Sequence, residues 1–115
     1  MSQGLCLAAD AYRIMWLFVF FDLPVQTPMQ RKRATRFRKD LLDDGFAMMQ
    51  YSVYIRHCAS KENAEVHMGR VKDFVPPDGF VSVMSITDKQ FGHIVNILGR
   101  KAVPPRRTPA QLEFF

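Results

Sequence analysis

The feature that most constrains the fold is an unbroken apolar run from Ile14 to Phe21, which ends at a single carboxylate, Asp22. A membrane-spanning helix needs about 20 apolar residues, so this run is too short to cross a bilayer. Its Val, Ile, Trp and Phe residues favour the extended state. Because apolar and polar residues do not alternate in it, the run predicts a central β-strand over residues 13–22 that is covered on both faces.

Length and composition indicate one small globular domain. The 115 residues suffice for a hydrophobic core. The net charge of +5 suits a polyanionic partner such as nucleic acid, although proteins with this charge often bind nothing acidic. Cys6 and Cys58 form no metal-binding spacing, and the N-terminus fails the signal-peptide pattern. We therefore expect free thiols and a cytoplasmic protein with no membrane segment.

A helix is predicted after the strand, over residues 28–44. Thr27 is its N-cap, Pro28 occupies the first helical position, and Gly45 is a typical terminator. At about 100° per residue, one face collects an apolar stripe and the other faces collect charge. The stripe consists of Gln30, Ala34, Phe37 and Leu41.

The first turns of this helix are basic, although the helix macrodipole favours anions there. One interpretation is a solvated surface, and the other is a phosphate-binding surface. Arg56, in the next extended segment, would either contact phosphate or pair with an acid. The residues predicted to bind nucleic acid are Arg31, Lys32, Arg33, Arg36 and Arg56.

The remaining elements complete an α+β pattern. Residues 46–57 are extended, and a turn near residues 50–52 would divide them into a hairpin. A second helix begins after Ser60 and ends before Pro76, a strand covers residues 80–87, a turn covers 88–90, and a short strand lies within 93–98. Residues 13–99 therefore predict a ferredoxin-like β-α-β-β-α-β sandwich. Since no further helix remains for the second face of the sheet, we expect a homodimer.

The two ends of the chain lie outside this domain. Residues 1–12 are expected to form a flexible arm, and residues 100–110 a basic, proline-rich linker without ladder or helix. Residues 111–115, QLEFF, predict an extra C-terminal strand that docks through Leu112, Phe114 and Phe115. The partner would be the sister subunit or a different protein, and the alternative is a disordered tail.

Several segments, in this order and spacing, resemble one protein family. They are FFDLP, RKRATRFRKDLLDDGF, MMQYSVYIRHC, NAEVHMGRVKDFVPPDG and ITDKQFG. Together they resemble the small CRISPR-associated adaptation protein, the partner of the integrase that inserts new spacers, in the form found beside type II systems. This resemblance implies a ferredoxin-like homodimer that lies between integrase dimers and binds double-stranded DNA. It also implies a metal-dependent endonuclease, with Asp22 as catalytic residue and metal ligand.

The residues themselves favour a scaffold over an enzyme. Magnesium usually binds two or more carboxylates, and Asp22 has no companion within the chain; a twofold dimer would supply a second Asp22, so that one Mg²⁺ is shared per dimer. Alternatively, Asp22 caps the following turn. His57, His67 and His93 are interpreted as surface or packing residues. We expect a DNA-binding scaffold that bridges integrase dimers, with endonuclease activity in addition; the alternative is a toxin-like, metal-dependent ribonuclease that acts without an integrase.

Overall fold

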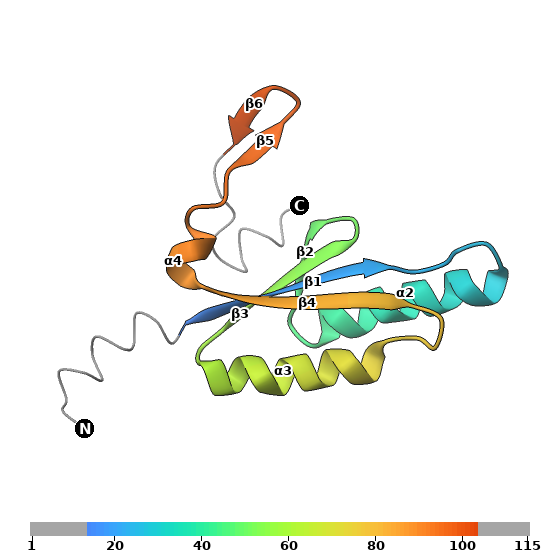
Figure 1. Cartoon of the computed structure of the whole chain (residues 1–115). Helices are drawn as coiled ribbons and strands as arrows, with labels where there is room; N and C mark the ends of the chain where they lie inside the picture. Colours follow the sequence, from blue (N-terminus) through green and yellow to red (C-terminus); the bar gives the residue numbers. More distant parts are fainter. Residues whose placement is uncertain (1–13, 104–115) are drawn as a thin grey trace.

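The computed structural model describes residues 14–103, which form a four-stranded antiparallel sheet with two helices on one face (Figure 1). The strand order is β2-β3-β1-β4, so the apolar strand is central. The elements of this layer are β1 (Met15–Asp22), α2 (Pro28–Asp43), β2 (Ala47–Gln50), β3 (Val53–Cys58), α3 (Lys61–Phe74) and β4 (Phe80–Thr87). The predicted ferredoxin-like α+β order is confirmed. None of the helices in this part of the chain is long and apolar enough to span a membrane.

The helices begin and end where the sequence places them. Thr27 caps α2 in a reciprocal capping box with Gln30, and Ser60 caps α3 by accepting from the backbone N–H of Asn63. Gly45 follows α2 with φ +93°, a conformation that glycine adopts without strain. The predicted turn after residue 50 is also present, because Gln50 pairs with Val53 across Tyr51 and Ser52.

The main core lies between the sheet and the two helices. Alternate residues of β1 point toward the helices and are buried there. Of the predicted stripe on α2, Ala34, Phe37 and Leu41 are buried, whereas Gln30 forms the capping box with Thr27. Phe21 meets the ring of Phe37 edge-on, with 5.0 Å between the ring centroids. The largest members of this core are Leu17, Val19, Phe21, Phe37, Leu41, Phe46, Tyr54 and Val71.

The second face of β1 is partly covered by the chain itself, so the expectation that the chain has nothing left to cover it is wrong. The residues expected to form a turn at 88–90 belong to a short helix, α4 (Asp88–Phe91). Phe91 stacks on Trp16 with ring centroids 3.8 Å apart, and Asp88 accepts a hydrogen bond from the indole nitrogen of Trp16 at 2.8 Å. A second small core of Trp16, Phe18, Ala47, Ile55 and Phe91 results.

The other end of this face is open. Phe20 is 37% exposed, Met84 43% and Phe80 73%. In the paired strands Phe18 lies opposite Met84, and Asp22 lies opposite Phe80, so these residues share the face turned away from α2 and α3. We call the exposed side chains of Phe20, Phe80 and Met84 the open apolar patch.

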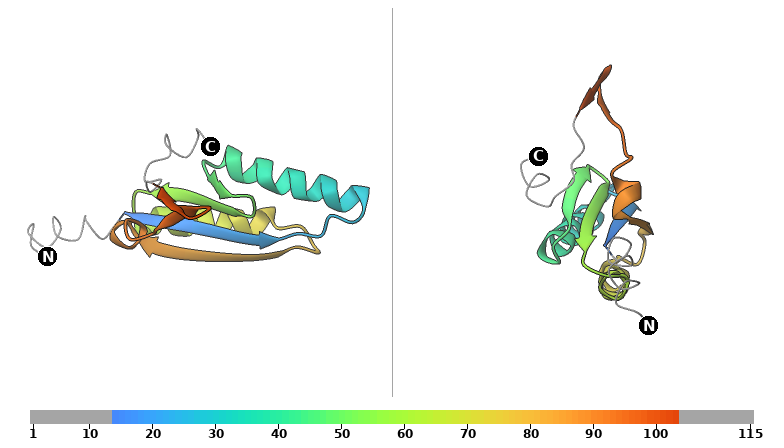
Figure 2. Two further views of the ribbon diagram at one scale, coloured as in Figure 1. Left: turned by 90° about the horizontal axis from the view of Figure 1, so that it is seen from above. Right: turned by 90° about the vertical axis from the view of Figure 1, so that its left-hand side faces the viewer.

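Beyond α4 the chain forms a second, small sheet that the sequence did not predict in full. The strand expected within residues 93–98 is β5 (Asn96–Leu98), and it pairs with β6 (Lys101–Val103). The expectation that residues from Arg100 onward form no ladder is therefore wrong for β6. Gly99, with φ +65°, supplies the positive φ that a two-residue hairpin loop requires. This hairpin projects from the side of the sheet opposite the two long helices (Figures 1 and 2).

The arm at residues 1–12, most of the linker and the docking strand at residues 111–115 lie outside the described residues. Cys58 is buried and free within the described chain, as expected, whereas Cys6 lies outside it.

Replacing Phe91 by Ala should destabilise the fold through the second core. Loss of a buried aromatic side chain costs about 3–5 kcal/mol, and Trp16, the single tryptophan, loses its stacking partner. We expect a lower free energy of unfolding in urea and red-shifted tryptophan emission. Ile97→Ala, at a side chain that is 65% exposed, is the control, and an equal effect of the two substitutions would contradict the packing described.

Candidate functional site

Asp22 lies at the carboxyl end of β1, exposed on the open face of the sheet. It follows Phe20 on that face and pairs in register with Phe80, so its carboxylate borders the open apolar patch. Within residues 14–103 its carboxylate accepts no hydrogen bond. The interpretation of Asp22 as a turn cap is therefore not what the structure shows.

Residues 14–103 of one chain do not by themselves offer a magnesium site. Among the residues that the structure describes, no group of three or more His, Cys, Asp or Glu side chains could hold a metal ion. Magnesium prefers an octahedral shell of oxygen ligands and is rarely held by a single carboxylate. The donor set at Asp22 fits such an ion only if a further carboxylate comes from another chain.

The predicted basic residues of α2 are exposed on more than one side of the helix, because Arg31 and Arg33 lie about 200° apart around its axis. Arg31, Lys32, Arg33 and Arg36 are exposed, and the first turn of α2 contains no acidic residue. They follow the loop that leaves β1, so they lie close in sequence to Asp22. We call these four residues the α2 cationic surface.

The four cations differ in how they are held. Arg31 Nη1 donates to the carbonyl oxygens of Val25 and Gln26, each at 3.1 Å, which fixes its guanidinium over the preceding loop. Arg33 Nη1 lies 3.9 Å from a carboxylate oxygen of Asp78.

Arg36 Nε donates to Asp40 at 3.2 Å, one helical turn away, in an exposed pair. Exposed pairs such as Arg33–Asp78 and Arg36–Asp40 contribute at most about 1 kcal/mol to stability. A phosphate can therefore displace the carboxylate of Asp78 or of Asp40 at small cost.

Arg56 is separate from this surface and is used within the fold. Its Nε donates to the carbonyl oxygen of Asp44 at 2.9 Å, and its Nη1 donates to that of His57 at 2.8 Å. It therefore bonds to backbone rather than to the acid side chain that sequence reasoning offered as one alternative. Since α2 has no basic residue in its own last turn, Arg56 supplies the cation that a helix C-terminus favours.

A partly buried cluster of Asp44, His67 and Arg70 joins the two helices, and sequence reasoning missed it. The side chain of Asp44 is only 6% exposed; its two carboxylate oxygens contact His67 Nδ1 at 2.7 Å and Arg70 Nη1 at 2.8 Å. His67 is thus a packing residue, as interpreted. The ring of His57 packs edge-on against the ring of Trp16, with 5.1 Å between the ring centroids, and His93 is exposed. The i, i+3 spacing of His67 and Arg70 was the only sequence signal that they share a helix face.

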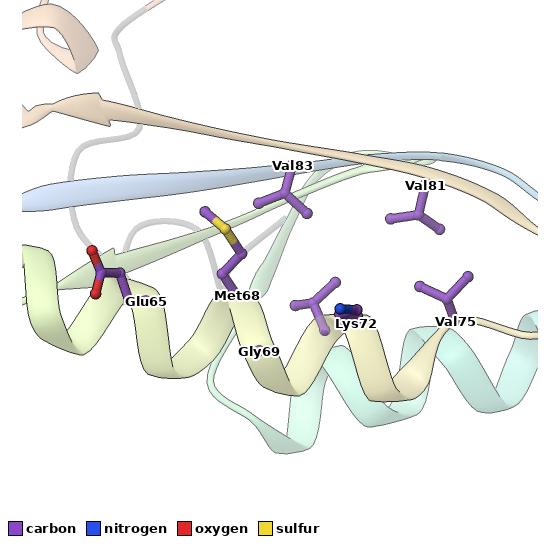
Figure 3. A pocket seen from close by; sticks show the side chains of 8 residues that line it. Glu65, Met68, Gly69, Lys72, Val75, Val81 and Val83 are labelled. Carbon is purple, nitrogen blue, oxygen red and sulfur yellow. The ribbon is translucent and has the colours of Figure 1, made fainter.

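A groove between α3 and β4 has a volume of about 470 Å³ (Figure 3). Its lining is largely aliphatic, and the two charged members, Glu65 and Lys72, belong to α3. This lining contains neither a cluster of carboxylates nor a histidine. Its aliphatic residues are Met68, Val71, Val75, Val81 and Val83.

Comparison with known proteins gives one consistent family. Residues 15–94 match the family model described as CRISPR associated protein Cas2. The chain is 56% identical over 101 residues to the CRISPR-associated endoribonuclease Cas2 of Parvibaculum lavamentivorans, covering 88% of this chain and 100% of that protein. It is 54% identical over 106 residues to the protein of the same description from Flavobacterium psychrophilum, covering 92% of each chain.

A solved structure gives the same answer at the level of the fold. A crystal structure of Cas2 matches with a TM-score of 0.54 at 25% identity, covering 83% of this chain and 98% of the other. The resemblance inferred from the sequence segments is thereby confirmed, and the chain belongs to the Cas2 family of CRISPR-associated proteins.

Proposed function

We propose that this chain is a dimeric scaffold of CRISPR spacer acquisition, which binds double-stranded DNA and bridges integrase dimers. The observation that supports this most directly is the α2 cationic surface, four exposed cations in the first turns of a helix with no acid in its first turn. Contacts to phosphate orient DNA without reading its sequence. A scaffold that must accept spacers of any sequence needs only such contacts.

The proposed homodimer is supported by the open apolar patch. Phe20, Met84 and Phe80 lie on a face that α4 covers only at its opposite end. A twofold contact applies the same patch on both subunits and would remove all three side chains from water. Burial of such side chains contributes about 1.5–3 kcal/mol each.

A second activity, metal-dependent endonuclease, is proposed from Asp22. The curated relatives are named endoribonucleases, and Asp22 is an exposed carboxylate at the border of the patch that the dimer would bury. A twofold axis near Phe20 would bring the second Asp22 close to the first. The two carboxylates would then share one Mg²⁺ per dimer, whose chemistry is to activate a water molecule and to neutralise charge on the phosphate.

The proposed integrase contact depends on the tail. Leu112, Phe114 and Phe115 lie outside the described residues, and they remain our proposed docking residues. The described sheet has two outer strands, β2 and β4, at which an added strand from a sister subunit could pair. A tail that docks onto the integrase instead leaves both edges unused.

Charge reversal of Arg31 and Arg33 together should weaken binding of duplex DNA. The plot of log affinity against log salt concentration has a negative slope, and its steepness falls by about 0.9 for each phosphate that the protein no longer neutralises. The double variant should therefore reduce the steepness by about 1.8. Titrations of a short duplex at several salt concentrations measure this slope. Lys61→Glu with Lys72→Glu, on α3, is the control of equal charge change; a common loss in both variants would show a net-charge effect and remove α2 from the DNA surface.

Asp22→Asn should abolish any magnesium-dependent nuclease activity while duplex binding persists, because the amide keeps the shape of the side chain and loses its charge. If the site is shared by two subunits, Phe20→Glu should also abolish cleavage, since it places a charge in the open apolar patch and separates the dimer. Sedimentation velocity reports the oligomeric state beside each cleavage assay. Cleavage by a Phe20→Glu monomer would refute the shared site.

Deleting residues 111–115 should abolish co-purification with the integrase and spacer acquisition, and should leave duplex binding by α2 intact. The matched control replaces Gln111 and Glu113 by Ala and retains Leu112, Phe114 and Phe115. Acquisition that survives the deletion would refute docking by the tail. Cleavage of RNA in cells that lack an integrase would favour the toxin-like ribonuclease.

A further inference from the structure

Arg38, on the third turn of α2, is held between aromatic rings. Its guanidinium carbon lies 4.2 Å from the centroid of the Tyr51 ring and 5.2 Å from that of Phe21. Such cation–π contacts contribute about 0.5–2 kcal/mol and fix the plane of the guanidinium. Phe21 belongs to β1 and Tyr51 to the turn between β2 and β3, so three separate parts of the chain position this one side chain.

The hydrogen-bonding state of Arg38 differs from that of five other arginines of the domain. Its Nε is buried and has no acceptor among residues 14–103. Arg31 and Arg56 donate to backbone carbonyls, and Arg33, Arg36 and Arg70 each lie beside a carboxylate. A buried donor without an acceptor costs about 1–3 kcal/mol. The contacts with Phe21 and Tyr51, rather than a hydrogen bond at Nε, therefore hold the side chain, and only its terminal nitrogens can reach an acceptor outside this part of the chain.

The surroundings of Arg38 suit an anionic acceptor. Tyr54 is buried, and its burial raises the pKa of the phenol while the positive charge of Arg38 acts in the opposite direction. The phenol is therefore neutral at neutral pH, so it places no negative charge near the guanidinium. Tyr51 is 71% exposed, so the site opens to solvent on its side.

The position of Arg38 on α2 links it to the α2 cationic surface. Arg31 and Arg38 are seven residues apart, close to two helical turns, so they occupy the same flank of α2 about 10.5 Å apart along its axis. This separation is close to the width of the DNA major groove, about 12 Å. Two cations at this distance can contact phosphates of one duplex at the same time.

We propose that Arg38, stacked on Tyr51, binds a backbone phosphate of double-stranded DNA beside the contact made by Arg31. This inference rests on the proposed function, and it adds to the DNA surface a residue that sequence reasoning left out. The planar guanidinium offers two parallel N–H donors to a phosphate, which a lysine in the same place does not. Tyr51 acts as a positioning residue, because it sets the guanidinium plane.

The test compares Arg38→Gln with Lys39→Gln, an equal charge change at the adjacent exposed residue. Duplex affinity of Arg38→Gln should fall roughly three- to tenfold at low salt, and its salt slope should fall by about 0.9. Arg38→Lys should keep most of the slope and lose part of the affinity, and Tyr51→Leu should behave in the same way. An Arg38→Gln variant with the affinity and slope of Lys39→Gln would overturn the proposal.

A measurement on the unaltered protein guards against a variant that fails to fold. The Nε–H resonance of Arg38, assigned by ¹⁵N NMR, should shift on addition of a short duplex and not on addition of inorganic phosphate at the same phosphate concentration. A shift with inorganic phosphate alone would mean a site for free phosphate and would overturn the proposal. If charge reversal of Arg31 and Arg33 weakens DNA binding while Arg38→Gln leaves it unchanged, only the proposed Arg38 contact is refuted. If neither variant weakens DNA binding, the proposed DNA-binding function itself is refuted.

Discussion

Burial of β1 on both faces is the constraint on which the rest of the structure depends. One set of alternate residues faces the helices, and in the other set Trp16 and Phe18 face Phe91, so the helices and α4 pack on opposite faces of this strand. A slip of one residue would exchange the two faces. Because both faces are apolar, hydrophobic burial alone does not resist that slip. Two polar features oppose the slip. It would break the hydrogen bond from Trp16 to Asp88, and it would bury the carboxylate of Asp22.

The two ends of α2 differ in where their stabilising charges come from. The α2 cationic surface occupies the end where a helix favours anions, so the helix lacks favourable charge at its own N-terminus. Its C-terminus is compensated from outside, where Arg56 of β3 donates to the carbonyl of Asp44 and Arg70 of α3 pairs with the Asp44 carboxylate. Other elements thus supply the cations of the C-terminal end. The four residues of the α2 cationic surface are left exposed, and the partners of its arginines are backbone carbonyls or carboxylates.

The sequence predicted what local rules govern and missed what distant contacts decide. The capping box at Thr27, the glycine after α2 and the apolar stripe could be read directly, because each depends on residues a few positions apart. The stacking of Phe91 on Trp16 joins residues far apart in the chain, and four residues of helix give no periodic signal. The bonds of Arg56 to carbonyl oxygens were equally hidden, because side-chain composition does not reveal which backbone groups lie within reach. The setting of Arg38 was hidden for the same reason, because its aromatic neighbours come from β1 and from the turn after β2.

The proposed scaffold and nuclease are linked by one short loop. Asp22 ends β1 on the open face, and five residues later Thr27 caps the helix that carries the α2 cationic surface. A duplex held by Arg31 would bring phosphates toward the exposed carboxylate of Asp22, and like charges at short range repel. A divalent cation between two Asp22 carboxylates would reverse that repulsion, because it carries the largest local charge at such a site. The affinity of the dimer for DNA and its affinity for the cation would therefore be coupled, and each would rise with the other whether or not the phosphodiester bond is cleaved.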